Sequence, residues 1–394
     1  MLVAIQTHPI QYHAPVFRAV QQQCHVPVTA IYGSDFSIRG YRDPEFGTTV
    51  TWDTDLLSGY SSEFLARSDQ GGARDVSEVS ARGLGTHLAR LRPAAVLIGG
   101  YSPAFHRTAL FSARRLGIPV LLRAETTDKE PAATLKRVPR RVALRGFYAQ
   151  CSRFLYIGQA SKRHYEALGC QPGSLVFSPY CVDESSFASD ESGRERMRAP
   201  ARAALGVQPD GIVVLFSGKL TPKKRPDLLL KAMADVHPAI RRPVTVVYLG
   251  DGELRTELEA QSTHLSGVQV RFVGFKRQRE LSPFYHAADI LVLPSQHSET
   301  WGLVVNEALL HGVPCVVSDA VGCRDDLVRS GHTGERFATG SASDLASALH
   351  RTLSLTGRAD VRAECRALAG VYSVSRAAAG IAEAYRSVAP SDAN

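Results

Sequence analysis

Short apolar runs alternate along the whole chain with segments in which apolar residues recur at helical spacing. Continuous apolar runs bounded by turn residues are typical of buried strands, and their alternation with helices is typical of a parallel sheet covered on both faces. The runs that predict strands are 2–7, 26–32, 95–98, 120–123, 154–157, 212–217, 244–249, 268–273, 290–293 and 315–318. The pattern therefore predicts an α/β fold with doubly wound sheets.

This strand and helix pattern occurs twice, on either side of a polar and charged stretch at 188–203, which has the composition of a linker or a surface helix. Of the 394 residues, 44% are hydrophobic, which is more than one core usually contains. We therefore expect a Rossmann-like domain over 1–185, a linker over 186–210 and a second Rossmann-like domain over 211–374. The remaining residues, 375–394, include an amphipathic segment, which predicts a helix that packs back on the first domain.

Composition narrows the classes of protein that fit this pattern. The formal net charge of +8 suits an anionic ligand, a nucleic acid or an anionic membrane surface. No zinc finger, RNP-type aromatic motif or basic-region helix is present, so we expect no nucleic-acid partner. No apolar run approaches the ~20 residues of a membrane-spanning helix, and the N-terminus does not resemble a signal peptide. The seven scattered cysteines contain no C-x-x-C pair, so we expect reduced thiols and a cytoplasmic location.

The most specific motif follows the predicted strand 290–293 and leads into a helix. Glu299 and Glu307 are separated by the glycine turn at Gly302, so the first lies on the loop and the second on the helix. A helix N-terminus offers unpaired N–H groups to a diphosphate. Glu299 can accept hydrogen bonds from sugar hydroxyls, and Glu307 can accept both hydroxyls of a ribose. The alternative is an amphipathic helix with an ordinary acidic residue near its start.

A second motif follows the predicted strand 212–217. Lys219 and Lys224 flank a turn there, so both ammonium groups can reach one anion. Two nearby cations offset diphosphate charge and stabilise a leaving group that gains charge in the transition state. The alternative is that 223–225 form a solvated basic loop.

These motifs resemble the signature of the GT-B-fold retaining glycosyltransferases of family 4, the glycosyltransferase group 1 type. The E-x7-E segment contains T-W-G-L, and G-K-L-T-P-K-K at 218–224 is similar to the family's G-[RK]-L-x-x-x-K phosphate clamp. G-D-G-E-L at 250–254 is similar to its G-x-G-x-L turn, V-G at 273–274 to the strand end where the base packs, and 176–183 to its hinge segment. The resemblance covers nearly the whole chain, strongly in the second half and loosely in the first.

The resemblance implies two Rossmann-like domains facing a central cleft, with the acceptor on the first. It implies a retaining, hexosyl-type transfer from a nucleotide-diphosphate sugar, UDP by default, to a hydroxyl of a polysaccharide, a lipid-linked intermediate or a small natural product. It implies no cofactor and no metal. The implied catalytic residues are Glu299, Lys224 and Lys219, and we add Glu125, which stands where many members have a histidine. The implied donor-binding residues are Gly218, Lys219, Lys224, Gly250, Gly274, Phe275, Glu299, Thr300, Trp301, Gly302, Leu303, Val304 and Glu307.

The first half departs from the family pattern at two loops. Where many members have a double glycine after the first strand, this chain has His8, Gln11 and His13, which we expect to contact diphosphate or acceptor. Where many members have a histidine near the donor sugar, this chain has Glu125, which can bind a sugar hydroxyl, an amino group or a cationic acceptor. Pairing of Glu125 with Arg123 or a lysine is the alternative.

Three further features of the first half leave alternatives open. Tyr101 follows a glycine pair after the predicted strand 95–98 and is an expected acceptor contact. The basic run 136–145 can contact an anionic membrane surface weakly or form a solvated face. Asp53 and Asp55 have the spacing of a metal-binding D-x-D triplet, but they follow 50–52 in the first half, so we expect no metal there.

Two other functions remain open alternatives to a glycosyltransferase. The first is a sugar-nucleotide epimerase or phosphorylase on the same fold, and the second is a non-catalytic protein that binds carbohydrate. The presence of Lys219, Lys224, Glu299 and Glu307 together favours the transferase. The donor sugar, the acceptor and the oligomeric state are not specified by these motifs.

Overall fold

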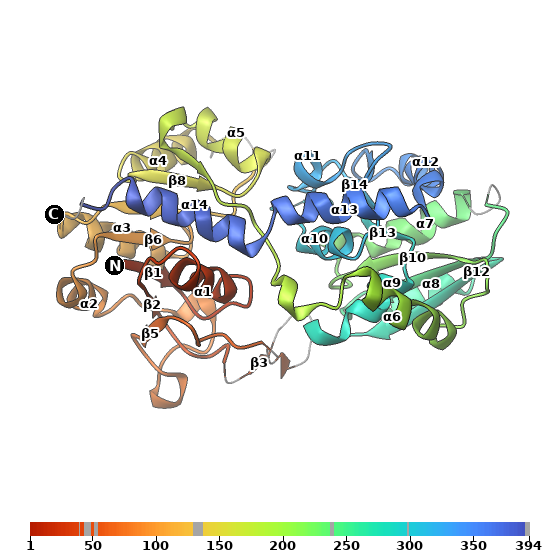
Figure 1. The fold of residues 1–394 in the computed structure, drawn as a ribbon, viewed down its shortest axis with the longest axis horizontal. Coiled ribbons are helices and arrows are strands. Elements are labelled where there is room, and N and C mark those ends of the chain that lie inside the picture. The colour runs from red at the N-terminus through yellow and green to blue at the C-terminus, as the bar shows by residue number, and fades with distance from the viewer. Residues whose placement is uncertain are drawn as a thin grey trace. The chain divides into compact units, whose positions relative to one another are not determined.

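The computed structural model describes residues 1–38, 40–42, 49–50, 54–128, 137–236, 240–297 and 299–390. The chain forms two compact units, each with its own sheet and core. The first comprises Met1–Tyr41, Thr49–Cys181 and Ser373–Asn394, and the second comprises Arg42–Thr48 and Val182–Tyr372 (Figure 1). The α/β prediction of two doubly wound domains is therefore confirmed.

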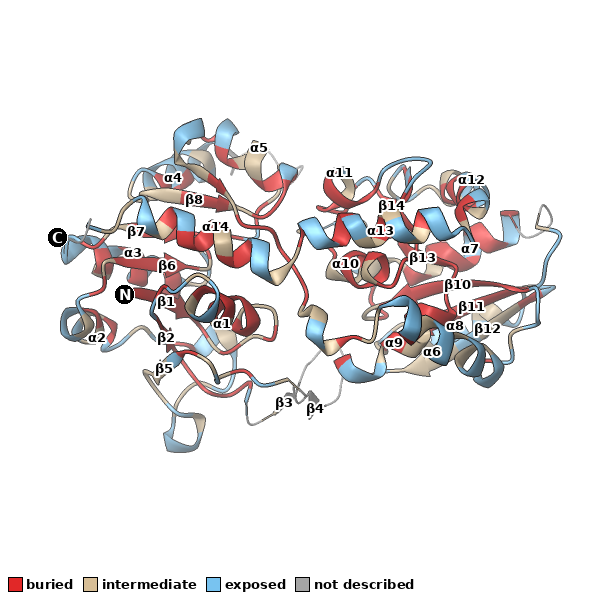
Figure 2. Ribbon diagram, viewed as in Figure 1, coloured by how far each residue is buried: buried red, intermediate tan, exposed pale blue. Residues whose placement is uncertain are grey.

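The first unit is built on a seven-stranded sheet with the order β5-β2-β1-β6-β7-β8-β9, in which every neighbouring pair is parallel. Its strands are β1 (Leu2–Gln6), β2 (Val28–Tyr32), β5 (Ser61–Phe64), β6 (Ala95–Ile98), β7 (Val120–Leu122), β8 (Arg153–Tyr156) and β9 (Leu175–Phe177). The short strands β3 (Tyr41–Arg42) and β4 (Thr49–Val50) pair separately. The central strands are buried along their whole length, which explains their uninterrupted apolar sequences (Figure 2).

Helices cover both faces of this sheet. One core is formed with α1 (Ala14–Gln22) and α14 (Val374–Arg386), and the other with α2 (Leu84–Leu91), α3 (Ala104–Arg115), α4 (Arg137–Tyr148) and α5 (Gln159–Ala167). The C-terminal helix α14 thus belongs to the first unit and lies beside α1 (Figure 1). Its Gly380 is required by close packing, since a Cβ there would lie 2.1 Å from the carbonyl oxygen of Phe177.

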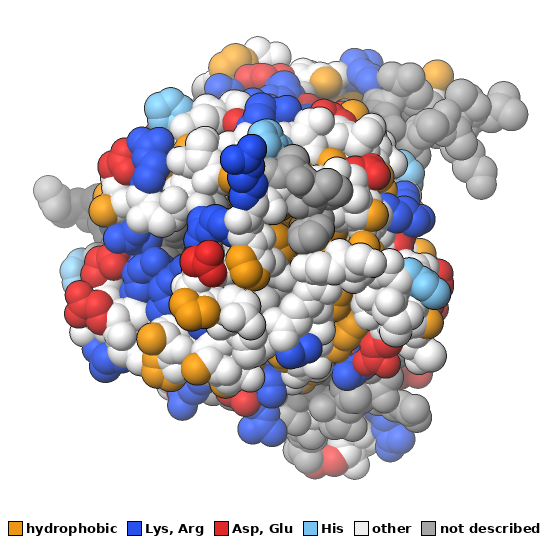
Figure 3. All heavy atoms as spheres, turned by 90° about the vertical axis from the view of Figure 1, so that its right-hand side faces the viewer, with side chains coloured by type: hydrophobic (Ala, Val, Ile, Leu, Met, Phe, Trp, Pro, Cys, Tyr) orange, Lys and Arg blue, Asp and Glu red, His pale blue; other side chains and the backbone are white. Residues whose placement is uncertain are grey.

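The second unit is built on a six-stranded sheet with the order β12-β11-β10-β13-β14-β15, again parallel throughout. Its strands are β10 (Ile212–Ser217), β11 (Val244–Leu249), β12 (Val268–Gly274), β13 (Ile290–Leu293), β14 (Cys315–Ser318) and β15 (Gly334–Phe337). Its helices are α6 (Glu191–Ala204), α7 (Pro226–Val236), α8 (Arg255–Ser262), α9 (Ser282–Ala287), α10 (Leu303–Leu310), α11 (Arg324–Leu327), α12 (Ala342–Thr352) and α13 (Ala359–Val371). On the face shown in Figure 3, basic side chains are interspersed with acidic ones.

The expected linker over 186–210 is wrong, because most of it forms α6, an integral helix of the second unit. Arg198 on α6 donates to the carbonyl oxygen of His286 at 2.7 Å and forms an ion pair with Asp289 at 2.5 Å. Arg202 reaches the same carboxylate at 3.1 Å. The helix is held largely through arginines rather than an apolar stripe, so its sequence has the composition of a linker. The chain passes between the units at Cys181 and Val182 instead.

Within the described residues, no helix combines the length and apolar character needed to cross a membrane. The same residues contain no group of three or more His, Cys, Asp or Glu side chains arranged to hold a metal ion.

Candidate functional site

The motifs of the second half meet at the carboxyl edge of the second sheet, where ligands bind in open α/β folds. Their loops are joined by backbone contacts. The Gly218 N–H donates to Leu249 at 2.9 Å, and the Gly250 N–H donates to Gly274 at 3.0 Å. Gly250 has φ 139°, and a Cβ there would lie 2.0 Å from the carbonyl oxygen of Gly218. The loops after β10, β11 and β12 therefore touch through their backbones, which requires glycine at Gly250.

The clamp lysine and the first glutamate of the E-x7-E motif are in contact. Lys224, at the end of the short turn Pro222–Lys224, donates to Oε2 of Glu299, and the Ser295 hydroxyl donates to the same oxygen at 2.9 Å. The two charged side chains are 20% and 13% exposed, so the pair is partly desolvated but reachable. Lys219 lies half-buried in the same loop. An anion can therefore bind to Lys224, and a hydroxyl group can donate to Glu299.

The loop 299–302 leads into α10 through Gly302, whose φ is 101°. Two backbone hydrogen bonds hold this loop in place. The Gly322 N–H donates to the carbonyl oxygen of Glu299 at 3.0 Å, and the Cys323 N–H donates to that of Trp301 at 3.0 Å. Thr300, Leu303 and Val304 are half-buried around this turn. The first N–H groups of α10 therefore come directly after the loop that carries Glu299.

The Trp301 side chain points into the core rather than toward a ligand. It is 2% exposed, its Nε1 donates to Oδ1 of Asn306 at 2.7 Å, and its ring lies 5.6 Å from the Tyr372 ring. Any donor contact of Trp301 is therefore restricted to its backbone, contrary to what the motif suggests for a side chain. The indole instead anchors the loop.

Glu307 lies one turn into α10 and is only 5% exposed. Burial raises the pKa of its carboxyl to about 7. The hydroxyl of Tyr285, which sequence reasoning did not identify, donates to Oε2 of Glu307 and lies 3.2 Å from Oγ of Ser217 at the end of β10. No described group donates to the other oxygen, Oε1, of Glu307. The described hydrogen bonds of the side chain therefore hold the carboxyl through Oε2 alone.

An aromatic ring is exposed at the neighbouring strand end. Phe275 follows Gly274, which has φ 71°, and is 38% exposed. The rings of Tyr248 on β11 and Phe272 on β12 stack on each other, 4.9 Å apart and 9° from parallel. An exposed aromatic ring at a strand end can stack on a nucleobase.

The histidines after β1 lie at the corresponding edge of the first sheet, and both are neutral near pH 7. Burial lowers the pKa of His8 to about 4 and that of His13 to about 3. His8 packs 4.5 Å from the Phe36 ring, and Nδ1 of His13 is buried without a described partner. Gln11, which lies between these two histidines in the sequence, is also buried. Each histidine can therefore contribute one N–H donor but no positive charge.

His106 on α3 is a third histidine at this edge, which the motifs did not reveal. Its Nδ1 lies 2.9 Å from the carbonyl oxygen of Ser102, while its Nε2 is buried without a described partner. Burial lowers its pKa as well. The sequence signal that could have identified His106 is its position shortly after the glycine pair 99–100, which follows β6.

Glu125 is exposed at the end of β7 and accepts a hydrogen bond from the Tyr180 hydroxyl. The suggested pairing with Arg123 is wrong. Arg123 is buried and donates instead to Oγ of Ser178 at 3.0 Å and to the carbonyl oxygen of Pro179 at 2.6 Å. Its guanidinium also lies 5.6 Å from the Tyr180 ring centre. Tyr180 belongs to the hinge segment 176–183, so this segment helps to orient the Glu125 carboxylate.

Tyr101 lines a groove of about 420 Å³ between α3 and α4. Arg107 donates to the Tyr101 carbonyl oxygen at 3.0 Å, and Arg140 donates to its hydroxyl at 3.3 Å. Phe111 in the groove and Val142 on α4 are 63% and 64% exposed. The helical part of the basic run is therefore accompanied by exposed apolar side chains, which its sequence did not suggest.

Two of the sequence motifs lie partly outside the described residues. Asp53 of the D-x-D triplet and Lys136 of the basic run are not described. Asp55 lies within a turn. Its Oδ1 accepts the N–H groups of Leu57 at 3.0 Å and Ser58 at 3.1 Å, and the Ser58 hydroxyl and these N–H groups lower its pKa to about 2.

Parts of the chain are similar in sequence to known glycosyltransferases. The family model described as glycosyl transferases group 1 matches residues 197–367. The D-inositol 3-phosphate glycosyltransferase of Streptomyces bingchenggensis is 37% identical over 163 residues, which are 39% of this chain and 35% of that protein. That of Geodermatophilus obscurus is 34% identical over 235 residues, which are 57% of this chain and 49% of that protein. The chain spans about a third to a half of the length of these relatives.

Solved structures resemble the chain over nearly its full length. Anabaena Alr3699/HepE in complex with UDP has a TM-score of 0.71 at 18% identity, covering 98% of this chain and 99% of that one. Sucrose-phosphate synthase from Thermosynechococcus elongatus has a TM-score of 0.69 at 16% identity, covering 98% of both chains. The fold is therefore that of the GT-B glycosyltransferases. The segment 197–367, which provides the joined strand-end loops, matches group 1 of these enzymes.

Proposed function

We propose that the protein is a retaining glycosyltransferase that transfers a sugar from a nucleotide-diphosphate sugar, by default a UDP-sugar, to an acceptor hydroxyl. The observation that carries this proposal is the Lys224–Glu299 ion pair, which lies where the loops of the second sheet converge and α10 begins. The sequence match of 197–367 to group 1 glycosyl transferases supports it. The UDP complex of Alr3699/HepE supports the choice of base.

In this proposal the second unit holds the donor. Lys219, Lys224 and the first N–H groups of α10 neutralise the diphosphate. Glu299 orients the sugar through its hydroxyls, Glu307 accepts the ribose hydroxyls, and Phe275 packs on the base. Donor binding requires Lys224 and Glu299 to share their present contact with phosphate and sugar oxygens, respectively.

The chemistry then depends on stabilising the leaving group. The bond between the anomeric carbon and the diphosphate oxygen breaks while Lys219 and Lys224 compensate the developing charge. The acceptor oxygen forms its bond on the same face, and its proton passes to the departing diphosphate, so that retention needs no protein nucleophile. Cationic side chains and helix N–H groups perform the work of a divalent ion in this scheme, so we propose a metal-independent reaction without a cofactor.

The first unit is proposed to hold the acceptor. His8 and His13 contribute neutral N–H donors, and Glu125, presented by Tyr180, accepts an acceptor or sugar hydroxyl. The curated relatives are named for D-inositol 3-phosphate, which makes a phosphate-bearing polyol the first acceptor to try. The groove at Tyr101 and the exposed valines of α4 support weak peripheral contact of a cytoplasmic protein with an anionic membrane surface.

The test is a calorimetric titration of the folded protein with UDP, GDP, dTDP and ADP in the presence of a chelator. Micromolar binding of one nucleotide, weakened in both Lys224→Ala and Glu307→Gln variants, is expected. Absence of binding by all four nucleotides from protein with a native circular dichroism spectrum would overturn the donor site. Binding without nucleotide release from any sugar donor, across a panel of hydroxyl acceptors, would indicate a non-catalytic carbohydrate-binding protein instead.

A further inference from the structure

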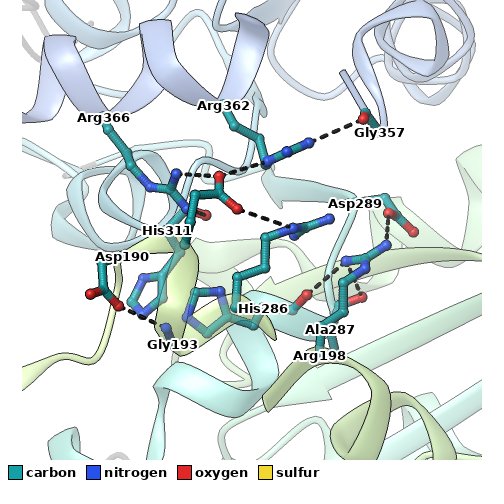
Figure 4. Close-up of polar contacts among 12 residues, drawn as sticks. Asp190, Gly193, Arg198, His286, Ala287, Asp289, His311, Gly357, Arg362 and Arg366 are labelled. Atoms are coloured by element: carbon teal, nitrogen blue, oxygen red, sulfur yellow. Dashed lines mark hydrogen bonds and ion pairs between the residues drawn. The ribbon is translucent and has the colours of Figure 1, made fainter. Parts of the chain in front are cut away.

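A cluster of buried aromatic side chains packs next to the C-terminal end of α10, and one of them donates a hydrogen bond to the Glu307 carboxyl. His311 directly follows α10 and is fully buried, as are the neighbouring Tyr285 and His286 of α9. Figure 4 shows His311 beside His286 and below Arg366, whose guanidinium donates to the His311 carbonyl oxygen at 3.3 Å. Nothing in the proposed chemistry uses His311, yet both of its ring nitrogens are engaged.

The hydrogen bonds of His311 define its tautomer. Nδ1 lies 2.7 Å from the backbone carbonyl oxygen of Glu307, which can only accept, so Nδ1 carries the proton. Nε2 lies 3.0 Å from Oγ of Ser282 and accepts its hydroxyl proton. The Ser282 oxygen in turn accepts the Ala188 N–H at 3.1 Å. Burial lowers the pKa of His311 to about 3, so the ring stays neutral and this arrangement is complete.

His311 also contacts Glu307 through a second route. Its ring stacks on Tyr285 with centres 5.0 Å apart and planes 19° from parallel. The Tyr285 hydroxyl donates to Oε2 of Glu307. One histidine thus contacts both the backbone of Glu307 and the phenol that donates to its carboxyl, while no described group donates to Oε1.

We propose that His311 is a positioning residue that sets the direction of the Glu307 carboxyl and thereby makes the site selective for ribonucleotides over deoxyribonucleotides. A hydroxyl is recognised strongly when a buried, pre-oriented acceptor would otherwise be left unpaired. His311 and Tyr285 provide that orientation without touching the ligand. This inference rests on the proposed function, in which Glu307 accepts the ribose hydroxyls.

His286 offers a matched control. It is buried to the same extent on the same helix as Tyr285, and its Nε2 lies 2.7 Å from the Ala188 carbonyl oxygen. Its ring lies 4.8 Å from that of His311, but it has no hydrogen bond to Glu307. Replacing His286 therefore removes a buried histidine and one backbone hydrogen bond without removing either support of the carboxyl.

The experiment measures the affinities of UDP and 2′-deoxy-UDP by calorimetry for the full-length protein and for the His311→Phe, His286→Phe and Glu307→Gln variants. At pH 8, above the pKa of about 7 of the Glu307 carboxyl, we expect the wild type to prefer UDP by on the order of tenfold or more, as for loss of a hydrogen bond to a charged group. His311→Phe is expected to reduce this ratio to below about threefold, as Glu307→Gln does, with little change in 2′-deoxy-UDP binding. His286→Phe is expected to keep the wild-type ratio.

The outcomes separate this inference from the function on which it rests. If the wild type binds neither nucleotide, the proposed donor site fails. If the wild type binds both but does not discriminate, or if His311→Phe keeps the wild-type ratio, the positioning role is overturned. Should His311→Phe not fold, His311→Asn keeps a donor near the Nδ1 position but loses the ring. Its ratio is expected to fall between those of the wild type and Glu307→Gln, and an unchanged ratio overturns the inference.

Discussion

Replacing Glu307 with glutamine should stabilise the second unit at pH 8 and change its stability little at pH 4. Glutamine keeps the size of the side chain and an oxygen that can accept the Tyr285 hydroxyl, but it cannot ionise. The wild-type carboxyl is 5% exposed in the interior of the unit, where ionisation is disfavoured. The difference between the two proteins therefore reports the cost of the buried charge.

The magnitude follows from linkage between protonation and folding. Burial raises the pKa of Glu307 to about 7 in the folded state, compared with 4.5 for an unperturbed glutamate. Between these two values the folded protein keeps a proton that the unfolded chain has released, so stability falls as the pH rises through this window. Since each tenfold change in an equilibrium constant is about 1.4 kcal/mol, the ionised carboxyl costs about 3 kcal/mol near pH 8.

The assay is urea unfolding followed by tryptophan fluorescence at pH 4, 6 and 8. The chain has two tryptophans, so in a Trp52→Phe background the buried Trp301 reports on the second unit alone. Glu257→Gln, on the exposed face of α8, serves as the control for loss of a carboxyl from the same unit. The advantage of Glu307→Gln should grow by about 3 kcal/mol from pH 4 to pH 8. A difference that stays constant with pH would refute the buried ionisation.

Three further predictions concern the same unit. Lys224→Ala should weaken UDP binding by about 10- to 100-fold in calorimetry, because a charge-assisted contact to phosphate is lost, and a change below twofold would contradict the clamp. Gly250→Ala should lower the free energy of unfolding by several kcal/mol in urea titrations, since the new Cβ would lie 2.0 Å from a carbonyl oxygen. Gly331→Ala, with φ 75° but no atom within 4 Å, should cost only about 1 kcal/mol, and equal losses would contradict the steric argument. Asp289→Ala should destabilise by about 3 kcal/mol in thermal or urea unfolding, because Arg198 and Arg202 would lose their buried partner, and an unchanged midpoint would show that this pair is dispensable.

The sequence was sufficient for the central strands of both sheets. β6, β10, β11, β13 and β14 match the predicted ranges, because strands buried on both faces must be continuously apolar. The edge strands β5, β9 and β15 were not predicted; β5 is polar and begins with the exposed Ser61, β9 has only three residues, and β15 contains Gly334, Glu335 and Arg336. The helix α6 was mistaken for a linker because its attachment to the unit relies on arginines bonded to carbonyl groups and to Asp289, which composition does not reveal.

For the site, the sequence by itself determined which loops take part, because chemistry-bearing residues directly after parallel strands must gather at one edge of the sheet. Only the tertiary structure decided how these residues are used. It brought Lys224 to Glu299 across 75 positions, turned Trp301 inward, and surrounded His8, His13 and Glu307 closely enough to move their pKa values. Contacts between distant segments and the desolvation of individual side chains depend on packing in three dimensions, and neither is recorded in the local order of residues.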